Sequence, residues 1–598
     1  MKKTSLFFLL TLLLSSLLPE HAFAVAASPY PVQVVQPDGS TITIRIHGDE
    51  FLNWTTCGSR LVARGSDGFF YYADFKADGS RELSATRAVY SNIALLDQTL
   101  TPVKPPAAAI EKARLAKAAA QIKTKAAAAP SAASFTTGSG KFLVILVEFQ
   151  DTKFTTPSPQ QAFSNLLNQE DYSVNGATGS ANDYFFDNSR GDFDPQFVVA
   201  GPVTASHNSA YYSIEDDVSD YVKELVAEAA QAVDSQVNFA EFDHDGNGYV
   251  DNIFVFFAGR GQNDSGDETT IWPHAWSIDQ YLYLDGKRVY RYACASELKT
   301  NRSDYSTRFT GIGTFCHEFG HVLGLPDFYD TDYEENGQAN GLGYYSLMDS
   351  GNYCNYGNTP PYLTCMERYI LDWMTDSDIT TLGTSGFYQL APVQNDVAYK
   401  SSTSSVNEYF LYENRQQSGW DAYIPGHGLL IYHVDKTSHY SSRWENNEIN
   451  AYSNHECFDL IEAASDYAPF PGPTGRTAFT SSTTPAAVNW AGNATGYNLS
   501  NIAEAGVTIS FTMGNTQILA YHSILNVKET YSAGERYTFS LMKNAAPGDP
   551  SSVSWYFDNV SKNALDFVIL TSGTHIVKAI LSYSNGTQET IVQEINVE

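Results

Sequence analysis

The chain has 598 residues, with 67 acidic and 36 basic side chains and a formal net charge of -31. This balance excludes a basic nucleic-acid-binding or membrane-surface protein, so nucleic acid is not an expected partner. A hydrophobic content of 43% excludes a chain that is disordered throughout and is enough for several packed cores. The charge is uneven, because residues 1–140 hold 14 Lys and Arg against 10 Asp and Glu, whereas residues 141–598 hold 22 against 57. This change of sign predicts a domain boundary near residue 140.

The N-terminus has the three parts of an export signal. Basic residues 2–3 precede an apolar core at 6–18, and a small-residue cleavage site follows at 22–24. The apolar core is too short to cross a bilayer, which takes roughly 20 residues, and no other apolar run reaches that length. We therefore predict a signal peptide at 1–24, no membrane span, and a protein that is secreted, periplasmic or at the cell surface.

Two segments follow the predicted signal peptide. Residues 30–90 alternate apolar and polar side chains between Asp-Gly pairs, which predicts short hairpin-forming strands, and we assign 25–105 as a pro-region. Residues 106–140 begin with an Ala-rich stretch that favours a helix and end in the Pro, Ser, Thr and Gly of a flexible connector. Exposed basic residues in such a connector are where proteases cut. The connector is thus an ordinary tether or, if a peptidase follows, the place of activation cleavage.

A metal-binding pattern stands in the middle of the chain. His317, Glu318 and His321 form H-E-x-x-H, after two apolar runs at 142–149 and 253–257 that predict buried strands. On a helix, positions i and i+4 lie on one face, so both imidazoles can bind one ion while Glu318 reaches a water on that ion. The spacing therefore predicts a helix that carries a catalytic metal.

The pattern continues past the predicted helix. Gly324 can take the left-handed conformation that ends a helix, so Asp327 can reach the metal from a new direction. Three protein ligands and one water form a catalytic zinc site. Met348, in a polar turn further on, can form an apolar floor beneath it. We predict zinc bound by both histidines and Asp327, with Glu318 as the general base.

These motifs resemble a known family. HEFGHVLGLPDFYD, followed by SLMDSGNY, is similar to the immune inhibitor A family of secreted bacterial metallopeptidases in the metzincin clan. Other stretches resemble that family's pro-region at 46–54, its catalytic domain at 182–194 and 271–276, and its next β-domain at 412–435 and 469–485. The resemblance implies a multidomain chain, in which an α+β, metzincin-like zinc peptidase domain at 141–379 follows the signal peptide and pro-region.

Two positions depart from the family's pattern. Most metzincins have His where this chain has Asp327, and no Tyr stands two residues after Met348. The group that stabilises the oxyanion of the transition state is therefore open. Tyr353 and His274 are weak candidates, each more readily explained as structural.

Strand patterns dominate the rest of the chain, after a helix that we expect to end near Trp373. Residues 380–515 predict a β-sandwich domain and residues 516–598 an immunoglobulin-like β module. Four side chains in this part are potential metal ligands but are more readily explained as ordinary strand residues: His433, Asp435, His455 and Glu456.

A second metal motif precedes one of the buried strands. Gly248 stands at the sharp turn of a calcium-type loop, and oxygen ligands recur at the loop's spacing: Asp243, Asp245, Asn247, the backbone carbonyl of Tyr249, and Asp251. Position 12 is Phe254 in place of the usual Glu, so a missing ligand must come from water or from a neighbour such as Glu241. The alternative is an Asp- and Gly-rich surface turn. We expect structural calcium here.

A pro-region can keep a zinc peptidase latent by placing its own ligand on the metal. The sequence offers the thiol of Cys57 and the carboxyls of Asp49 and Glu50, and it does not choose between them. Cys57 is as well explained as a small buried residue. Six cysteines in so long a chain are not a disulfide framework, and Cys354 with Cys365 is the one pair that proximity suggests.

The leading hypothesis is a secreted zinc endopeptidase, made as a zymogen, that hydrolyses peptide bonds of protein substrates. The alternative is a surface binding or adhesion protein whose peptidase domain is secondary or inactive. A calcium-dependent structural protein would account for residues 243–251 but not for residues 317–348. The complete set of His317, Glu318, His321 and Asp327 favours the enzyme. Substrate preference and oligomeric state stay open.

Overall fold

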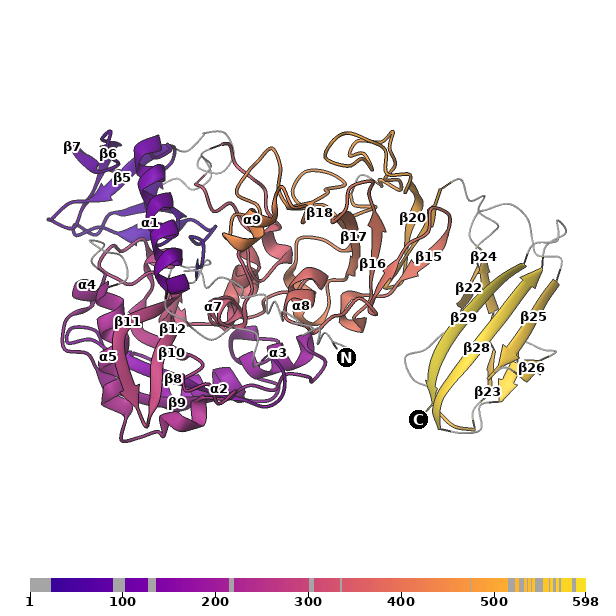
Figure 1. Ribbon diagram of the computed structural model, residues 1–598, viewed down its shortest axis with the longest axis horizontal. Coiled ribbons are helices and arrows are strands. Elements are labelled where there is room, and N and C mark those ends of the chain that lie inside the picture. The colour runs from indigo at the N-terminus through magenta and orange to yellow at the C-terminus, as the bar shows by residue number, and fades with distance from the viewer. Residues whose placement is uncertain are drawn as a thin grey trace, which may run out of the picture. The chain divides into compact units, whose positions relative to one another are not determined.

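The computed structural model describes residues 23–89, 103–126, 136–213, 220–300, 306–333, 336–473 and 475–514, and shorter stretches between 522 and 597. Residues 1–22 of the predicted signal peptide lie outside this part. The chain forms two compact units, one of Met1–Thr384 with Tyr388–Phe511 and one of Ser385–Phe387 with Thr512–Glu598. Each unit is described by itself (Figure 1).

The first region is an antiparallel sheet in which each strand pairs with the next along the chain. Its six strands are β2 (Val32–Val35), β3 (Thr41–Gly48), β4 (Asn53–Cys57), β5 (Arg60–Arg64), β6 (Phe70–Phe75) and β7 (Arg81–Arg87). The predicted hairpins are thereby confirmed. The Ala-rich start of the connector is helix α1 (Ala107–Ala126), which lies beside this sheet in Figure 1. Ile110 and Ala113 of α1 pack against Trp54 and Leu61 of the sheet, so the helix is docked.

A mixed sheet forms the centre of the next region. Its order is β1-β11-β12-β10-β8-β9, with β13 paired to β12. The bounds are β1 (Phe23–Ala24), β8 (Lys141–Glu148), β9 (Gln196–Thr204), β10 (Ile253–Arg260), β11 (His274–Leu284), β12 (Lys287–Thr300) and β13 (Thr307–Phe309). Strands β9, β8, β10 and β12 are parallel, and β11 is antiparallel to β12. The two predicted buried strands are β8 and β10.

Helices cover both faces of this sheet. They are α2 (Pro159–Asn168), α3 (Ala181–Asn188), α4 (Ser209–Tyr212), α5 (Asp220–Val233), α6 (Gln262–Ser265), α7 (Gly313–Leu323) and α8 (Cys365–Ile370). Successive side chains of a strand point to opposite faces. Accordingly, Leu143, Ile145 and Val147 of β8 lie in the core with α5, whereas Phe142 and Leu146 lie in the core with α2, α3 and α7. The helix expected near Trp373 is α8, which ends at Ile370.

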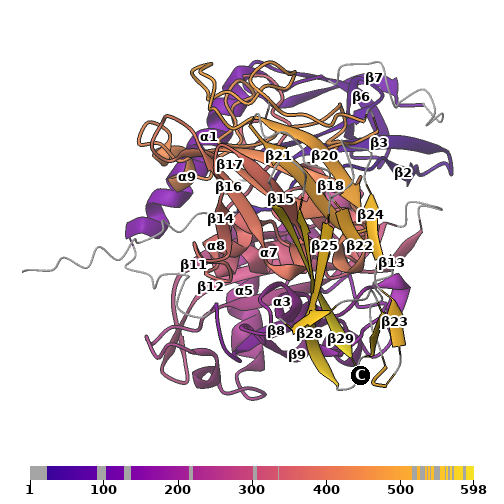
Figure 2. The same cartoon turned by 90° about the vertical axis from the view of Figure 1, so that its right-hand side faces the viewer.

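Two further sheets follow in the same unit. One has the order β14-β16-β17-β18-β19, with bounds Ile379–Thr381, Ala398–Ser402, Glu408–Arg415, Gly428–Asp435 and Phe458–Leu460. The other has the order β15-β21-β20, with bounds Gly386–Leu390, Thr508–Met513 and Leu499–Ala505. Phe511 of β21 contacts Tyr399 and Tyr412 of the first sheet, so the sheets share a core (Figure 2). Helix α9 (Ser441–Glu445) lies between β18 and β19 in sequence.

The second unit contains strands in the described part of 522–597. Its sheets are β22-β24, β23-β27 and β26-β25-β28-β29. The bounds are β22 (His522–Leu525), β23 (Arg536–Thr538), β24 (Ser540–Lys543), β25 (Ser552–Phe557), β26 (Val560–Lys562), β27 (Asp566–Val568), β28 (Gly573–Ser582) and β29 (Gln588–Val597). The strands predicted from sequence fall within β25, β28 and β29. The immunoglobulin-like module stays a prediction.

Short 3-10 helices complete the described secondary structure. They are η3 (Val174–Gly176), η4 (Phe239–Phe242), η5 (Gly343–Tyr345), η6 (Ser350–Gly357), η7 (Val393–Asn395) and η8 (Gly419–Tyr423). None of the described helices is long and apolar enough to cross a membrane. The suggested Cys354–Cys365 pair is wrong, because all six cysteines are buried thiols. Cys354 lies instead beside the carbonyls of Tyr344 and Tyr423.

Candidate metal centre

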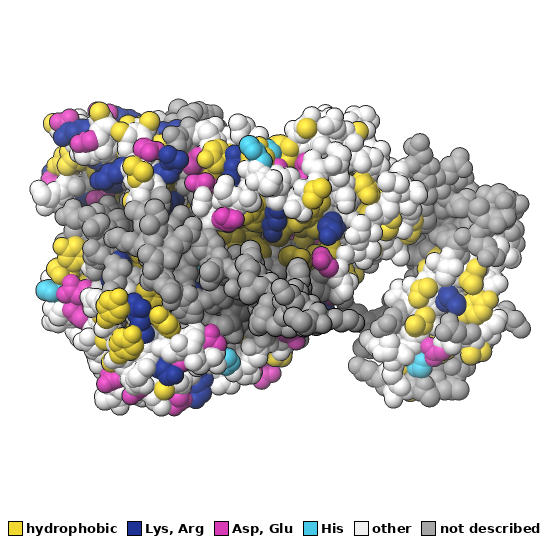
Figure 3. Space-filling model, viewed as in Figure 1, with side chains coloured by type: hydrophobic (Ala, Val, Ile, Leu, Met, Phe, Trp, Pro, Cys, Tyr) yellow, Lys and Arg dark blue, Asp and Glu magenta, His cyan; other side chains and the backbone are white. Residues whose placement is uncertain are grey.

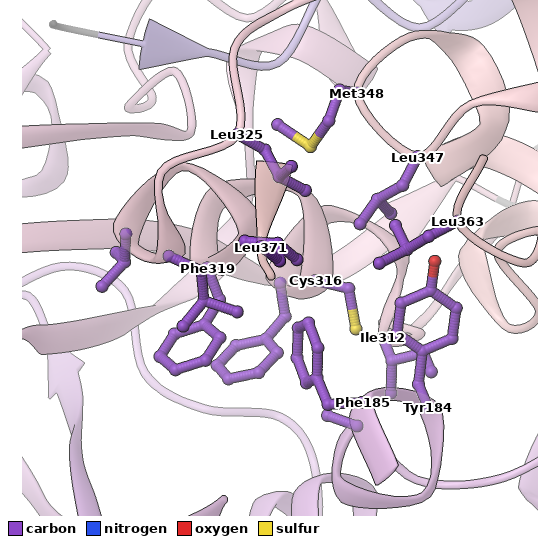
Figure 4. Close-up of a cluster of buried hydrophobic side chains, with 14 of the residues drawn as sticks. Tyr184, Phe185, Ile312, Cys316, Phe319, Leu325, Leu347, Met348, Leu363 and Leu371 are labelled. Carbon is purple, nitrogen blue, oxygen red and sulfur yellow. The ribbon is translucent and has the colours of Figure 1, made fainter. Parts of the chain in front are cut away.

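Helix α7 carries the H-E-x-x-H residues, and every residue of Gly313–Leu323 is buried. The helix ends at Gly324, whose φ of 109° lies in the left-handed region. The predicted helix and its glycine turn are thus confirmed. Figure 4 shows Cys316 and Phe319 of α7 on one side of the helix and Met348 on the other. The apolar side chains fix the helix in the core and leave its other side for the motif.

Met348 lies directly against α7. A Cβ added at Gly320 would come within 2.9 Å of the Met348 sulfur, so glycine allows this close approach. The turn is held by buried Glu367, which accepts hydrogen bonds from the Met348 N–H at 3.2 Å and from the Ser346 hydroxyl at 2.7 Å. The Met348 carbonyl in turn accepts from the Phe328 N–H at 2.9 Å. The methionine therefore lies next to the motif, as the sequence indicated.

His317, His321 and Asp327 come together as a group able to hold a metal ion. The two Nε2 atoms are 3.2 Å apart, and Asp327 Oδ1 lies 3.5 Å from His317 Nε2 and 3.3 Å from His321 Nε2. Ligands at about 2.0–2.1 Å from a tetrahedral ion stand roughly 3.3–3.4 Å apart. The three atoms therefore have the spacing that zinc requires.

The other nitrogen of each imidazole fixes its tautomer. Nδ1 of His317 lies 2.9 Å from the Leu347 carbonyl, and Nδ1 of His321 lies 2.8 Å from the Leu325 carbonyl. A carbonyl can only accept, so each Nδ1 carries the proton and each Nε2 keeps a lone pair. Metal-binding histidines are oriented in this way. The burial of His321 lowers its pKa, which also favours the neutral ring.

Asn447 completes the surroundings of Asp327, and the sequence analysis missed it. Its side-chain amide donates to Asp327 Oδ2 at 2.7 Å, and its side-chain carbonyl accepts from the Asp327 N–H at 2.7 Å. Asn447 lies between β18 and β19, 120 residues from its partner. No local motif could have pointed to it.

Glu318 is buried beside the three candidate ligands. Its Oε1 accepts a hydrogen bond from the Val25 N–H at 3.0 Å, and its Oε2 has no partner among the described residues. Burial, and then the negative charges of Asp327 and Glu50, raise the pKa of Glu318 well above its usual value. A carboxyl with a raised pKa can hold a proton near neutral pH, as a general base must after taking one.

Segment 23–28 crosses the centre as extended chain. Strand β1 adds to the edge of the mixed sheet by pairing antiparallel with β11. The next two carbonyls accept side-chain hydrogen bonds, that of Val25 from Trp272 Nε1 at 2.8 Å and that of Ala26 from the Tyr353 hydroxyl at 2.6 Å. Val25 of the first region therefore contacts Glu318, the predicted general base.

Of the two oxyanion candidates, only Tyr353 donates a side-chain hydrogen bond to this segment. Both ring nitrogens of His274 are engaged, Nδ1 at 2.8 Å from the Trp272 carbonyl and Nε2 at 2.8 Å from the Tyr292 hydroxyl. His274 therefore serves the packing of β11 and β12. Tyr353 donates to a peptide carbonyl and is the better placed of the two.

The three latency candidates lie in different surroundings. Cys57 packs in the apolar core of the first-region sheet. Asp49 accepts from Lys117 of α1 and from the Tyr333 hydroxyl, each at 2.6 Å. Both carboxylate oxygens of Glu50 are buried without a hydrogen-bond partner among the described residues.

Glu50 shares its surroundings with the metal centre. Burial raises the pKa of Glu50 most, and the charges of Asp49 and Asp327 raise it further. The oxygens of Glu50 join Glu318 Oε2 and Asp327 Oδ1 as buried oxygens that lack a partner in the described part of the chain. Burial and neighbouring negative charges disfavour the charged forms of Glu50 and Glu318, and a bound cation would offset this.

The second motif also brings its acidic residues together. Asp243, Asp245 and Asp251 form the other group able to hold a metal among the described residues. Burial, and then the charges of Asp245 and Asp243, raise the pKa of Asp251 to about 7. Asp243 Oδ1 is buried without a hydrogen-bond partner, although its Oδ2 accepts from Lys287.

Two other predicted members of the loop make hydrogen bonds within it. The Asn247 side chain donates to Asp245 and accepts from the Tyr249 N–H, which closes the turn. Glu241, suggested as a missing ligand, pairs instead with Lys141 at 2.7 Å. The loop therefore brings three carboxylates together, and among the residues that the structure describes no fourth acidic side chain joins them in place of the Glu of position 12.

The four uncertain ligands of the β-domain do not form such a group in the described structure. His433 pairs with Glu408 and His455 pairs with Asp435, each at 2.9 Å. Glu456 accepts from the backbone N–H groups of Asn340 and Gly341. These contacts agree with the interpretation from sequence that the four side chains are structural and not metal ligands.

Two imidazoles and a carboxylate on a helix and its glycine turn, with a buried glutamate beside them, are typical of H-E-x-x-H metallopeptidases. Residues 130–374 match the family model "Immune inhibitor A peptidase M6, catalytic domain". The resemblance of this chain to the immune inhibitor A family, indicated by its motifs, is therefore confirmed.

Two relatives agree with this family. The chain is 27% identical over 276 residues to the pre-pro-metalloprotease PrtV of Vibrio cholerae, covering 37% of this chain and 28% of that protein. It is 26% identical over 260 residues to immune inhibitor A of Bacillus thuringiensis subsp. alesti, covering 37% of this chain and 38% of that protein. These alignments span about a third of either relative, and they support a peptidase at the level of the domain.

A solved structure gives a weaker likeness. The crystal structure of OgpA from Akkermansia muciniphila shares 13% identity, covering 78% of this chain and 96% of that chain, with a TM-score of 0.22. A TM-score this low carries no argument about fold or function.

Proposed function

We propose that this protein is a secreted zinc endopeptidase, made as a zymogen, that cleaves peptide bonds of protein substrates. The observation that carries the proposal is the arrangement of His317, His321 and Asp327, whose ligand atoms stand 3.2–3.5 Å apart beside Glu318. The M6 family match supports a metallopeptidase. Secretion follows from the predicted export signal at 1–24 and, like the metzincin-like fold, is part of the proposal.

The residues divide the chemistry among themselves. His317, His321 and Asp327 would hold the zinc, which when bound lowers the pKa of a water towards neutrality and polarises the substrate carbonyl. Glu318 accepts the proton of the attacking water and then delivers it to the leaving amine. Met348 and the apolar side chains around α7 keep the ligand helix fixed and exclude bulk water. Tyr353 is the proposed donor to a substrate carbonyl.

The test is the variant Glu318→Gln in the full-length protein, assayed after trypsin has cut the connector. Glutamine keeps the shape but cannot accept a proton, so we expect about one zinc per chain and loss of casein cleavage by at least 10²-fold, at the lower end for a lost general base. Glu241→Gln, which changes an exposed glutamate of the same domain, is the matched control and should keep activity. Casein cleavage retained by Glu318→Gln would contradict the assignment.

The first region supports the proposed latency. Its Val25 donates a backbone hydrogen bond to Glu318 Oε1. Ion pairs join the first-region sheet to the domain below it, with Arg64 beside Asp267 and Arg81 beside Glu268. We assign Glu50 as the latency group, because it alone of the three candidates has carboxylate oxygens buried without a hydrogen-bond partner among the described residues, and the charge of Asp327 acts on its pKa. Cleavage of the connector at 106–140 would release the region.

Calcium is the second proposed ion. The three carboxylates of Asp243, Asp245 and Asp251 converge at the turn before β10, and an ion there would stabilise the charged form of Asp251. Lys287, which pairs with Asp243, is the cation that a calcium ion would have to displace from one oxygen. The proposed role is structural, because β10 is a central strand of the mixed sheet.

A further inference from the structure

We propose that Asn447 positions the zinc ligand Asp327, so that the segment between β18 and β19 is part of the catalytic metal centre. This inference rests on the proposed zinc site. Asn447 lies outside residues 130–374, the part that matches the M6 catalytic domain. The three candidate ligands and Glu318 lie within that domain. The metal centre would then also depend on a residue of the following β-domain.

The contact between the two side chains is reciprocal. Asn447 uses both polar atoms of its amide on one residue, donating to Asp327 Oδ2 and accepting from the Asp327 N–H, each at 2.7 Å. Asp327 is 1% exposed and Asn447 is 8% exposed, so water does not compete for either hydrogen bond. The pair fixes both the side chain and the backbone of the ligand residue.

This pairing decides which carboxylate oxygen faces the histidines. Oδ2 is held by Asn447, whereas Oδ1 lies 3.3 Å from His321 Nε2 and has no hydrogen-bond partner among the described residues. Rotation of the carboxylate about its χ2 would break its buried hydrogen bond with Asn447. Asp327 is thus prepared to give one oxygen to a metal, in the orientation that three-ligand zinc needs.

Asn447 is itself held in place by its neighbours. Its φ of 56° lies in the left-handed region, which asparagine tolerates better than most residues. Its backbone carbonyl accepts from the Thr331 hydroxyl at 3.0 Å. Three positions after it, Asn450 donates to the Phe328 carbonyl at 2.9 Å. The segment therefore docks along the loop that carries the ligand.

Aromatic packing and further hydrogen bonds extend this docking. The ring of Phe328 contacts Phe458 at 5.1 Å between centroids, and the Asn336 side-chain carbonyl accepts from the Ser453 N–H at 2.8 Å. Docking alone would explain these contacts without any effect on zinc. The two explanations differ in what happens when a docking contact is lost away from Asp327.

The experiment compares zinc affinity in three full-length variants. Asn447→Ala removes both hydrogen bonds to Asp327, and Asn447→Ser replaces them with a side chain too short to make both. Asn336→Ala, the matched control, removes docking contacts of the same segment without touching Asp327. Zinc affinity is measured by competition with a fluorescent chelator, and the visible spectrum of the cobalt-substituted protein reports the geometry of the ligands.

We expect Asn447→Ala to bind zinc 10–100-fold more weakly and to show an altered cobalt spectrum, as for other lost partners of metal ligands. Asn447→Ser should fall between this variant and the wild type, and it replaces the alanine variant if that one does not fold. Asn336→Ala should keep wild-type affinity. Wild-type affinity in the Asn447 variants, or an equal loss in Asn336→Ala, would overturn the inference.

The readouts separate this inference from the proposed function. Zinc bound tightly by the wild type but weakly by Asn447→Ala, with no peptidase activity in either, would support the inference and contradict the endopeptidase. Peptidase activity in the wild type and in Asn447→Ala, with equal zinc affinity in the two proteins, would contradict the inference and support the endopeptidase. A wild type that binds no zinc would overturn both.

Discussion

Glu50 shows how one side chain distinguishes the three latency candidates. No sequence pattern favours it over Cys57 or Asp49. In the structure, Cys57 is part of an apolar core and Asp49 accepts hydrogen bonds from Lys117 and Tyr333, whereas both oxygens of Glu50 are buried without a hydrogen-bond partner among the described residues. A buried carboxylate without a partner is costly unless a cation lies beside it.

The variant Glu50→Gln tests whether Glu50 is the latency group. We expect the uncut variant to cleave casein measurably, whereas the uncut wild type and Cys57→Ser stay latent until trypsin cuts the connector. Removing zinc should also lower the melting temperature less in Glu50→Gln than in the wild type, because the variant leaves no uncompensated charge. If the uncut Glu50→Gln chain is as latent as the uncut wild type, Glu50 is not the latency group.

At the scale of elements, the turn before β10 holds a second cluster of carboxylates that a bound cation would stabilise. With zinc resupplied after chelation, calcium at a hundred times its dissociation constant should stabilise the fold by about 2.7 kcal/mol. Asp251→Asn should lose this response, whereas Asp234→Asn, an exposed aspartate of the same domain, should keep it. If calorimetry shows that calcium does not change the melting temperature of the wild type, the loop is an ordinary surface turn and not a calcium site.

Strands β17 and β18 carry a pH-dependent contact. Burial alone would raise the pKa of Glu408, but hydrogen bonds from His433 and from the Trp490 N–H lower it to about 2. Its unfolded value is about 4.3. A lowered folded pKa gives stability that is complete above the unfolded value and is lost as the pH falls through the folded one.

We therefore expect Glu408→Gln to melt at a lower temperature than the wild type at pH 7. The difference should shrink between about pH 4.3 and pH 2. Glu504→Gln, which loses the more exposed pair with His427, is the control and should differ little from the wild type at any pH. Melting curves at pH 7, 5 and 3 measure both differences, and a constant gap for Glu408→Gln would contradict the argument.

At the scale of the whole molecule, the uneven distribution of charge and the division into two compact units lead to predictions about how the parts are held together. Figure 3 shows Lys and Arg next to Asp and Glu over the first-region sheet, where ion pairs join it to the acidic domain. The positive sign of residues 1–140 thus has a structural counterpart. Such exposed pairs contribute little singly and weaken with salt, so packing and two more buried contacts must supply most of the attachment: that of Lys117 with the Thr331 carbonyl and that of Asp49 with the Tyr333 hydroxyl.

Residues 512–598 belong to a separate compact unit. We expect a chain that ends at Gly514 to keep zinc and casein cleavage and to lose one calorimetric transition. A chain that ends at Asp435 lacks Asn447 and should lose tight zinc binding. Loss of zinc in the longer truncation would show that the second unit is needed for the metal centre.

The sequence by itself determined the helix of the H-E-x-x-H motif, its end at Gly324 and the candidate ligands. These features lie within eleven positions of one another, and the i,i+4 spacing and the glycine turn act locally. The hairpins of the first region and the buried strands were equally predictable, because their signal is the period of their own side chains.

Only the tertiary structure decided what surrounds the motif. Asn447 contacts Asp327 across 120 residues, and Val25 reaches Glu318 across 293. The fold also engaged both nitrogens of His274 and left Glu50 unpaired. Such contacts follow from the packing of the first region and the β-domain against the catalytic one. No local spacing encodes them, because the partners meet only after distant segments have folded.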